Sequence, residues 1–76
     1  MQDKIKEIIA NILDIAMDLI DENSSPETIE KWDSLKHMNI IIALEEEFNI
    51  EFSDEDMLEM LNYQLIILTI KDKLDA

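Results

Sequence analysis

Ser34 is the residue whose type and setting most favour chemistry, because it follows Asp33 where a polar loop gives way to an apolar helix. Two interpretations are open: Asp33 or Ser34 caps the helix, or Ser34 is displayed for a reaction that another protein performs. A serine nucleophile needs a base held by an orienting group. The only histidine, His37, lies three residues away on a different part of the helix surface. The sequence therefore predicts no catalytic triad and no enzyme.

Two acidic runs, at residues 45–47 and 54–56, are the other groups that could bind a ligand, because clustered carboxylates attract hard cations. The sequence has no glycine, so it lacks both the calcium-loop pattern with its central glycine and a glycine loop that cradles phosphate. It has no cysteine, which excludes disulfides, thiolate metal sites and a catalytic thiol. We therefore expect no metal site, and in His37 a solvated helix residue with no site role.

The net charge and the length of the chain exclude several classes of function. The 76 residues include 19 acidic and 6 basic side chains, and the net charge of -13 repels nucleic acids and anionic membranes while it favours basic partners. Hydrophobic residues make up 47% of the chain, which supports a folded core but one too small for a deep enzyme pocket. The sequence suggests no signal peptide and no membrane-spanning stretch. We expect a single domain, residues 1–76, that is monomeric and cytoplasmic.

Apolar residues recur at helical spacing and predict an all-α fold. A long first helix should end before Leu19, and its apolar stripe comprises Ile5, Ile8, Ile9, Ile12, Leu13, Ala16, Leu19 and Ile20. A long polar loop is expected at residues 21–31, where Pro26 disfavours a helix. The second helix should begin at Asp33 or Ser34 and run to about Phe48.

Two further helices complete the predicted bundle. After a break at residues 49–52, the hydroxyl of Ser53 can accept from the amide of Asp56 and so cap a short third helix over residues 54–60. Asn62 is a candidate cap for the last helix, whose inward stripe should comprise Tyr63, Ile66, Ile67, Ile70 and Leu74. We therefore predict four helices, three longer and one short, with a long loop between the first and second.

The second predicted helix has two apolar faces. At about 100° per residue, one arc comprises Ile40, Ala43, Leu44 and Phe48, and the other, next to Ser34, comprises Leu35, Met38 and Ile42, with Ile41 near the border. The second arc is either buried by a neighbouring element or left exposed, and exposure beside a displayed hydroxyl would suggest docking. Trp32 likewise either anchors the loop to the core, which its place before a helix favours, or contacts a partner.

Three segments at fixed offsets resemble one protein family. Asp33-Ser34-Leu35 begins the second helix, residues 43–48 (ALEEEF) end it, and residues 50–56 (IEFSDED) lead into the third. Together with the amphipathic flanks, this arrangement closely resembles the acyl carrier proteins over nearly the whole chain. The resemblance implies an acyl-carrier-like four-helix bundle and a protein that is a substrate of enzymes rather than an enzyme.

The resemblance also implies the chemistry of Ser34, which matches the family serine that carries a covalent 4'-phosphopantetheine arm. A magnesium-dependent phosphopantetheinyl transferase donates this arm from coenzyme A, and the terminal thiol of the arm holds acyl or aminoacyl groups as thioesters. Asp33 would flank the site and help to orient the transferase. The further partners implied are an acyl- or aminoacyl-loading ligase and acyltransferases or synthases. Docking would involve residues of the second helix: Leu35, Lys36, Met38, Ile42, Glu45 and Glu46.

The sequence departs from the carriers of fatty acid synthesis close to the serine. Lys36, His37 and Asn39 stand where those carriers usually have acidic residues, and the usual glycine upstream of Asp33 is absent. A cation there would repel arginine-rich partner surfaces, which favours a specialised pathway, such as an aminoacyl or polyketide route, over general fatty acid synthesis. Two alternatives are an unmodified acidic adaptor that docks a basic protein and, ranked last, a minimal hydrolase that uses Ser34.

Overall fold

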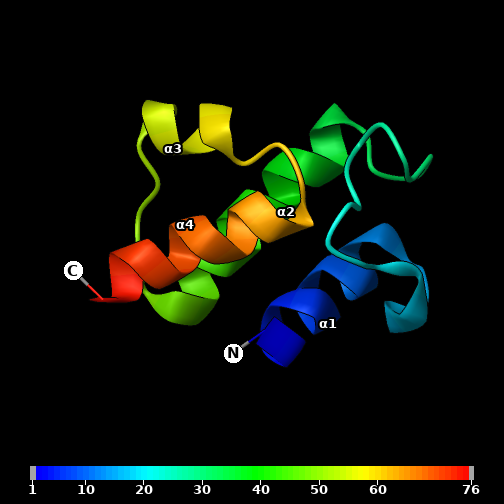
Figure 1. Ribbon diagram of the computed structural model, residues 1–76, viewed down its shortest axis with the longest axis horizontal. Coiled ribbons are helices and arrows are strands. Elements are labelled where there is room, and N and C mark those ends of the chain that lie inside the picture. The colour runs from blue at the N-terminus through cyan, green and yellow to red at the C-terminus, as the bar shows by residue number, and fades with distance from the viewer. Residues whose placement is uncertain (1, 76) are drawn as a thin grey trace.

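The computed structural model describes residues 2–75, which form four α-helices and one 3-10 turn and contain no strand (Figure 1). The elements are α1 (Gln2–Leu13), η1 (Met17–Leu19), α2 (Ser34–Phe48), α3 (Asp54–Glu59) and α4 (Tyr63–Asp75). The predicted all-α bundle, with its short third helix and long first loop, is confirmed.

A single apolar cluster joins the helices. α1 packs against α2, and α3 packs against α4. The buried members of the cluster are Ile5, Ile9, Ala10, Leu13, Ile20, Trp32, Ile40, Ile41, Leu44, Phe52, Met60, Tyr63, Ile66, Ile67 and Ile70. α3 contributes no fully buried residue, only the partly buried Met57, and it lies at the edge of the molecule in Figure 1. α3 is therefore the helix that is anchored least by buried side chains.

α1 and α2 both end at a residue with left-handed backbone, although the chain has no glycine. Asp14 has φ 57° after α1, and Asn49 has φ 54° after α2; these are the two side-chain types that tolerate this conformation best. After α1, the amide of Ile15 donates to the carbonyl of Ala10 at 3.1 Å, which closes the last turn. This helix stop was not predicted, because the apolar stripe continues beyond it.

The loop between α1 and α2 spans residues 14–33, longer than predicted, and hydrogen bonds tie its two ends together and its middle to α4. Lys31 Nζ donates to the carbonyl of Asp14 at 3.1 Å, and the amide of Tyr63, at the start of α4, donates to the carbonyl of Ser24 at 2.8 Å. Ile20 and Trp32 lie in the core, so Trp32 is an anchor as favoured. In Figure 1 the loop (cyan) lies at the same end of the molecule as the start of α2. It therefore shapes the surroundings of Ser34.

The start of α4 matches the prediction, but its end does not. The amide of Leu65 donates to Oδ1 of Asn62 at 2.8 Å, which confirms the predicted cap. Leu74 is 44% exposed, so its assignment to the inward stripe was wrong, because the core along α4 ends one turn earlier at Ile70. None of the helices formed by residues 2–75 has the length and apolar character needed to cross a membrane.

Candidate functional site

Ser34 is the first residue of α2, and its side chain is exposed. The residue before it makes the cap: Asp33 has extended backbone, and its Oδ1 accepts from the amide of Lys36 at 2.8 Å. The carbonyl of Asp33 accepts from the amide of His37 at 2.9 Å, which closes the first turn. Within residues 2–75 no side chain or backbone group forms a hydrogen bond with the Ser34 hydroxyl. Since Asp33 caps the helix, this hydroxyl is available for chemistry.

The electrostatics of this helix end favour an anion. The first turn of α2 contains no acidic residue, although the chain as a whole carries a net charge of -13. The unpaired amides of a first turn and the helix dipole together place partial positive charge there. The half-buried Lys36 adds a positive charge in the same turn. The remaining amides of this turn, the helix dipole and Lys36 would therefore stabilise a phosphate attached to Ser34, against one neighbouring carboxylate, that of the Asp33 cap.

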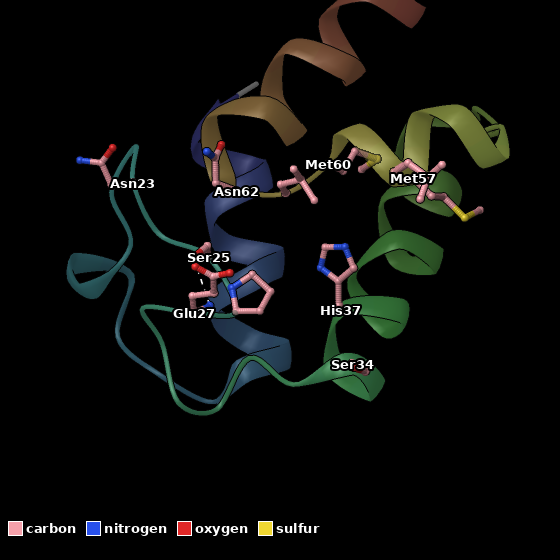
Figure 2. Close-up of a pocket in the computed structure, with 11 residues that line it drawn as sticks. Asn23, Ser25, Glu27, Ser34, His37, Met57, Met60 and Asn62 are labelled. Atoms are coloured by element: carbon pink, nitrogen blue, oxygen red, sulfur yellow. Dashed lines mark hydrogen bonds between the residues drawn. The ribbon is translucent and has the colours of Figure 1, made fainter.

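An open pocket of about 600 Å³ lies beside Ser34 (Figure 2). Its lining residues are Asn23, Ser25, Pro26, Glu27, Ser34, His37, Met57, Leu58, Met60, Leu61 and Asn62. The loop after α1 supplies a mainly polar wall, and α3 with the connection to α4 supplies an apolar one. In Figure 2 Ser34 lies at the lower end of the pocket, and the His37 ring points from α2 toward Met60. A flexible chain attached to Ser34 could thus enter a pocket with both polar and apolar contacts.

The prediction that His37 is a solvated helix residue was wrong. His37 is half-buried, and its Nδ1 accepts from Nε1 of Trp32 at 2.9 Å. The two ring centroids are 5.9 Å apart and the ring planes are inclined by 32°. Burial lowers the pKa of His37 below its usual value of 6.5, because the less polar surroundings disfavour the imidazolium form. Helical periodicity places His37 on α2 but carries no information on this contact with a core residue of the loop.

Ser34 and His37 do not form a pair of nucleophile and base. The indole Nε1 of Trp32 can only donate, so Nδ1 of His37 must accept and the neutral ring carries its proton on Nε2. The nitrogen that is not occupied by Trp32 is therefore a donor and cannot take the proton of the Ser34 hydroxyl. This arrangement supplies none of the activation that a serine hydrolase requires.

The two apolar faces of α2 differ in burial. Ile40, Ile41 and Leu44 are buried in the core, whereas Leu35 is 70%, Met38 48% and Ile42 47% exposed. The exposed residues start directly after Ser34 and continue along the helix for two turns. The interpretation of this second arc as core is therefore wrong. We call Leu35, Met38 and Ile42 the exposed face of α2.

The two carboxylates expected to dock partners have different surroundings. Glu46 is exposed, but Glu45 is half-buried and its Oε2 accepts from the amide of Phe52 at 2.8 Å. Glu45 therefore holds the connection between α2 and α3 in place. The neighbouring Glu47 is paired with Lys4 of α1 at 3.5 Å between Oε1 and Nζ. Glu46 is the member of this acidic run whose charge is most available to a partner.

The second acidic run stabilises the start of α3. Ser53 Oγ accepts from the amide of Asp56 at 3.1 Å, and Oδ2 of Asp56 accepts from the amide of Ser53 at 2.9 Å, so the predicted cap is confirmed. Oδ2 of Asp56 also lies 2.7 Å from Nζ of Lys73 on α4. The bond from Lys73 and the bonds with Ser53 lower the pKa of Asp56. Across residues 2–75 no group of three or more histidine, cysteine or acidic side chains is placed to hold a metal ion.

The apolar wall of the pocket was not predicted. It consists of Met57, Leu58, Met60 and Leu61, on α3 and directly after it. Leu58 and Leu61 are 75% and 65% exposed, and both line the same pocket, so they form a contiguous exposed apolar surface. Two leucines three residues apart, one on a short acidic helix and one just after it, could have indicated a binding surface.

Comparisons with known proteins agree with this geometry. A family model described as "Phosphopantetheine attachment site" matches residues 3–66. An acyl carrier protein of Buchnera aphidicola subsp. Schizaphis graminum is 41% identical over 73 residues, which cover 96% of this chain and 92% of that protein. One from Nitratidesulfovibrio vulgaris is 34% identical over 96% of both chains. The solution structure of a holo acyl carrier protein from Geobacter metallireducens superposes with a TM-score of 0.87 and 27% identity, over 97% of this chain and 85% of that one.

Proposed function

The chain belongs to the acyl carrier proteins, and from this membership we propose that Ser34 is the residue that bears the phosphopantetheine arm. The protein is therefore an acyl carrier with a covalent 4'-phosphopantetheine group, which supplies a terminal thiol for thioesters. Since the chain has no cysteine, that thiol is a chemical group that its own residues lack. As a carrier, the protein is a substrate of enzymes and is not itself a catalyst.

The observation that supports Ser34 most strongly is the free, exposed hydroxyl at the start of α2. Asp33 forms the cap, so modification of Ser34 breaks no hydrogen bond of the fold. Within the carboxylate of Asp33 only Oδ1 is used by the cap, and the exposed side chain can turn Oδ2 toward the transferase or its metal ion. We propose this flanking role for Asp33, in line with the family pattern.

The residues around Ser34 fit the arm in two ways. The first turn of α2, which lacks acidic residues, accommodates the phosphate. The adjoining pocket of about 600 Å³ offers apolar side chains for methylene groups and polar ones for amides. The pocket is open to solvent along one side, so a group held there can leave it again when a partner enzyme docks.

Acyl carrier proteins interact with phosphopantetheinyl transferases, acyltransferases and synthases, and we propose that the exposed face of α2 is where such enzymes dock. Its three apolar side chains stand beside Ser34, and the exposed charge of Glu46 and the half-buried Lys36 flank them. Glu45 supports this surface from inside through its bond to Phe52. Lys36 would pair with an acidic group of the partner, which distinguishes these partners from enzymes that present only cations.

This charge pattern favours a dedicated set of enzymes, with an acyl- or aminoacyl-loading ligase among them, in fatty acid, polyketide or another specialised biosynthesis. The proposal includes a monomeric protein in the cytoplasm, where coenzyme A is available to the transferase. The family membership disfavours the alternative of an unmodified acidic adaptor.

The proposal is tested by the intact mass of the protein after incubation with coenzyme A, magnesium and a promiscuous phosphopantetheinyl transferase. The wild-type chain and Ser53→Ala should each gain the mass of one phosphopantetheine group, and Ser34→Ala should gain none. Ser53 is a suitable control because it is also an exposed serine at a helix start. A wild-type chain without added mass, or Ser34→Ala with it, would contradict the proposal.

A further inference from the structure

His37 is the polar side chain of the pocket that lies one helical turn after Ser34. We propose that His37 positions the arm or its cargo by donating a hydrogen bond from Nε2 to a carbonyl oxygen in the pocket. The inference rests on the proposed function, because the carbonyl belongs to the group attached at Ser34. It assigns a role to a residue that is neither a nucleophile nor a part of the exposed face of α2.

The hydrogen bond from Trp32 fixes which nitrogen of His37 can donate. Trp32 Nε1 lies 2.9 Å from Nδ1, and an indole nitrogen is a donor only. Nδ1 must therefore be unprotonated, and the ring proton of neutral His37 is on Nε2. Among residues 2–75 this Nε2 has no hydrogen-bond partner, so its donor is available to a ligand.

Trp32 also fixes the direction of the ring. The indole is 1% exposed and locked into the core, so the hydrogen bond ties the imidazole to a rigid side chain. With Nδ1 directed at Trp32, Nε2 on the far side of the ring is turned toward the pocket, where Figure 2 places the ring between Ser34 and Met60. A donor that is oriented before binding loses little freedom when it meets its acceptor.

The chemistry of the pocket indicates a neutral acceptor. His37 stays neutral because burial disfavours its imidazolium form, and Met57 and Met60 make that side of the pocket apolar. A charged phosphate would lose hydration beside these apolar side chains, whereas an amide or thioester carbonyl is uncharged and fits this side of the pocket better. Other polar groups of the lining already serve local structure: Ser25 Oγ accepts from the amide of Glu27, and Asn62 Oδ1 accepts from that of Leu65.

Two carbonyl sources are available, the amides of the arm and the thioester of its cargo, and nitrogen NMR of the imidazole can distinguish them. The chain has one histidine and one tryptophan, so both ring signals are assigned without ambiguity. Spectra would be compared for the unmodified chain, the chain carrying the arm, and the chain carrying a butanoyl arm transferred from butanoyl-coenzyme A. Intact mass establishes beforehand that the arm is attached.

The Nε2–H signal should shift and exchange more slowly with water once its acceptor is present. A change on addition of the arm alone supports an amide acceptor, and a change only in the butanoyl form supports the thioester carbonyl. An unchanged signal in both forms would overturn the inference while leaving the proposed function intact. A chain that gains no mass would overturn the proposed function and the inference with it.

Variants give an independent measure through the rate at which a maleimide alkylates the thiol of the arm. The assay reports on the amide acceptor, because the free thiol carries no thioester. His37→Phe removes the donor but keeps an aromatic ring, and with an amide acceptor it should raise the alkylation rate about two- to tenfold, the range expected for one neutral hydrogen bond. His37→Gln keeps an N–H donor and should stay closer to the wild type. If His37→Phe and His37→Gln both alkylate at the wild-type rate, His37 does not position the arm.

Discussion

The starts of α2 and α3 have the same arrangement of a buried aromatic residue followed by a capping residue, but a different type of residue forms the cap. Each has a buried aromatic residue, Trp32 or Phe52, then a capping side chain, Asp33 or Ser53. At α3 the serine is itself the cap, so its hydroxyl is bound to the helix amide. At α2 the aspartate is the cap and Ser34 comes one position later. The shift by one residue leaves an exposed serine hydroxyl free for modification.

The charged residues near the two helix starts also differ. Asp54, Glu55 and Asp56 fill the first turn of α3, so negative charge already compensates the positive end of its dipole. The first turn of α2 has no acidic residue and contains Lys36, and the Asp33 cap is the one carboxylate from the cap through that turn. A phosphate is therefore repelled more strongly at α3, which has three carboxylates in its first turn, than at α2, which has one at its cap. An exposed serine at a helix start is thus insufficient as a signal, and its position relative to the cap and the charges nearby decide its role.

The largest expected effect concerns the aromatic anchors that the two starts share. Trp32→Ala and Phe52→Ala should each lower the free energy of unfolding by about 3–5 kcal/mol, because each removes a buried aromatic side chain from the core. Urea denaturation followed by circular dichroism measures both. A loss below about 1 kcal/mol for either variant would mean that this aromatic residue does not anchor its helix.

Removal of a cap should have an intermediate effect on stability, and this effect should distinguish Ser53, which is a cap, from Ser34, which is not. Ser53→Ala and Asp33→Ala should each cost about 1 kcal/mol of stability, the usual value for the loss of an N-cap. Ser34→Ala should change stability by less than about 0.5 kcal/mol, because its hydroxyl makes no hydrogen bond within residues 2–75. The same denaturation experiment compares the three variants. Equal losses for Ser34→Ala and Ser53→Ala would remove the distinction between the two helix starts.

A smaller effect should accompany modification itself. The phosphate added at Ser34 should raise the free energy of unfolding by about 0.3–1 kcal/mol, through its interaction with the positive end of α2. Thermal unfolding of the modified and unmodified chains at low salt measures this gain. The gain should shrink at high ionic strength, which screens exposed charges. Destabilisation on modification at low salt would show that this helix end does not accommodate the phosphate.

The smallest expected effect is on the pH dependence of stability, because it comes from one half-buried group, His37. The pKa of His37 is lowered in the folded chain, so below about pH 6.5 the unfolded chain binds more protons and stability falls as the pH drops. His37→Gln should lose this part of the pH dependence. Asp56, whose pKa is lowered from 3.8, affects stability only in a more acidic range, so the two contributions separate. Identical pH profiles of wild type and His37→Gln between pH 5 and 7 would contradict the burial of His37.

Local signals predicted most of the fold. Asp33, Ser53 and Asn62 all cap the helices whose starts they suggested, because an N-cap depends on only a few adjacent residues. The stop of α1 was missed, because Asp14 takes a conformation usually signalled by glycine while the apolar stripe runs on to Ile20. Leu74 has the right spacing for the core but lies beyond its end. Periodicity predicts which face of a helix is apolar, not how far the neighbouring elements extend.

The sequence supplies the proposal for the attachment residue but not the surroundings of that residue. The order Asp33-Ser34-Leu35 and its distance from the third helix resemble the acyl carrier proteins, and this resemblance is the source of the proposal that Ser34 bears the arm. The pocket depends on a loop, α2 and α3 meeting in space, and the bond from Trp32 to His37 depends on a tryptophan that enters the core from that loop. Neither can be derived from helical spacing. These tertiary contacts, rather than the serine motif, carry the inference about His37.

The most direct test of the attachment site is to find which residue carries the arm by fragmentation mass spectrometry of the modified chain. The sequence offers Ser24, Ser25 and Ser53 as internal competitors, of which Ser53 is the exposed serine at a helix start. We predict that every fragment bearing the added mass contains Ser34 and that no fragment lacking Ser34 bears it. Added mass on Ser53 or on the loop serines would contradict the claim that the free hydroxyl after the Asp33 cap is the attachment site.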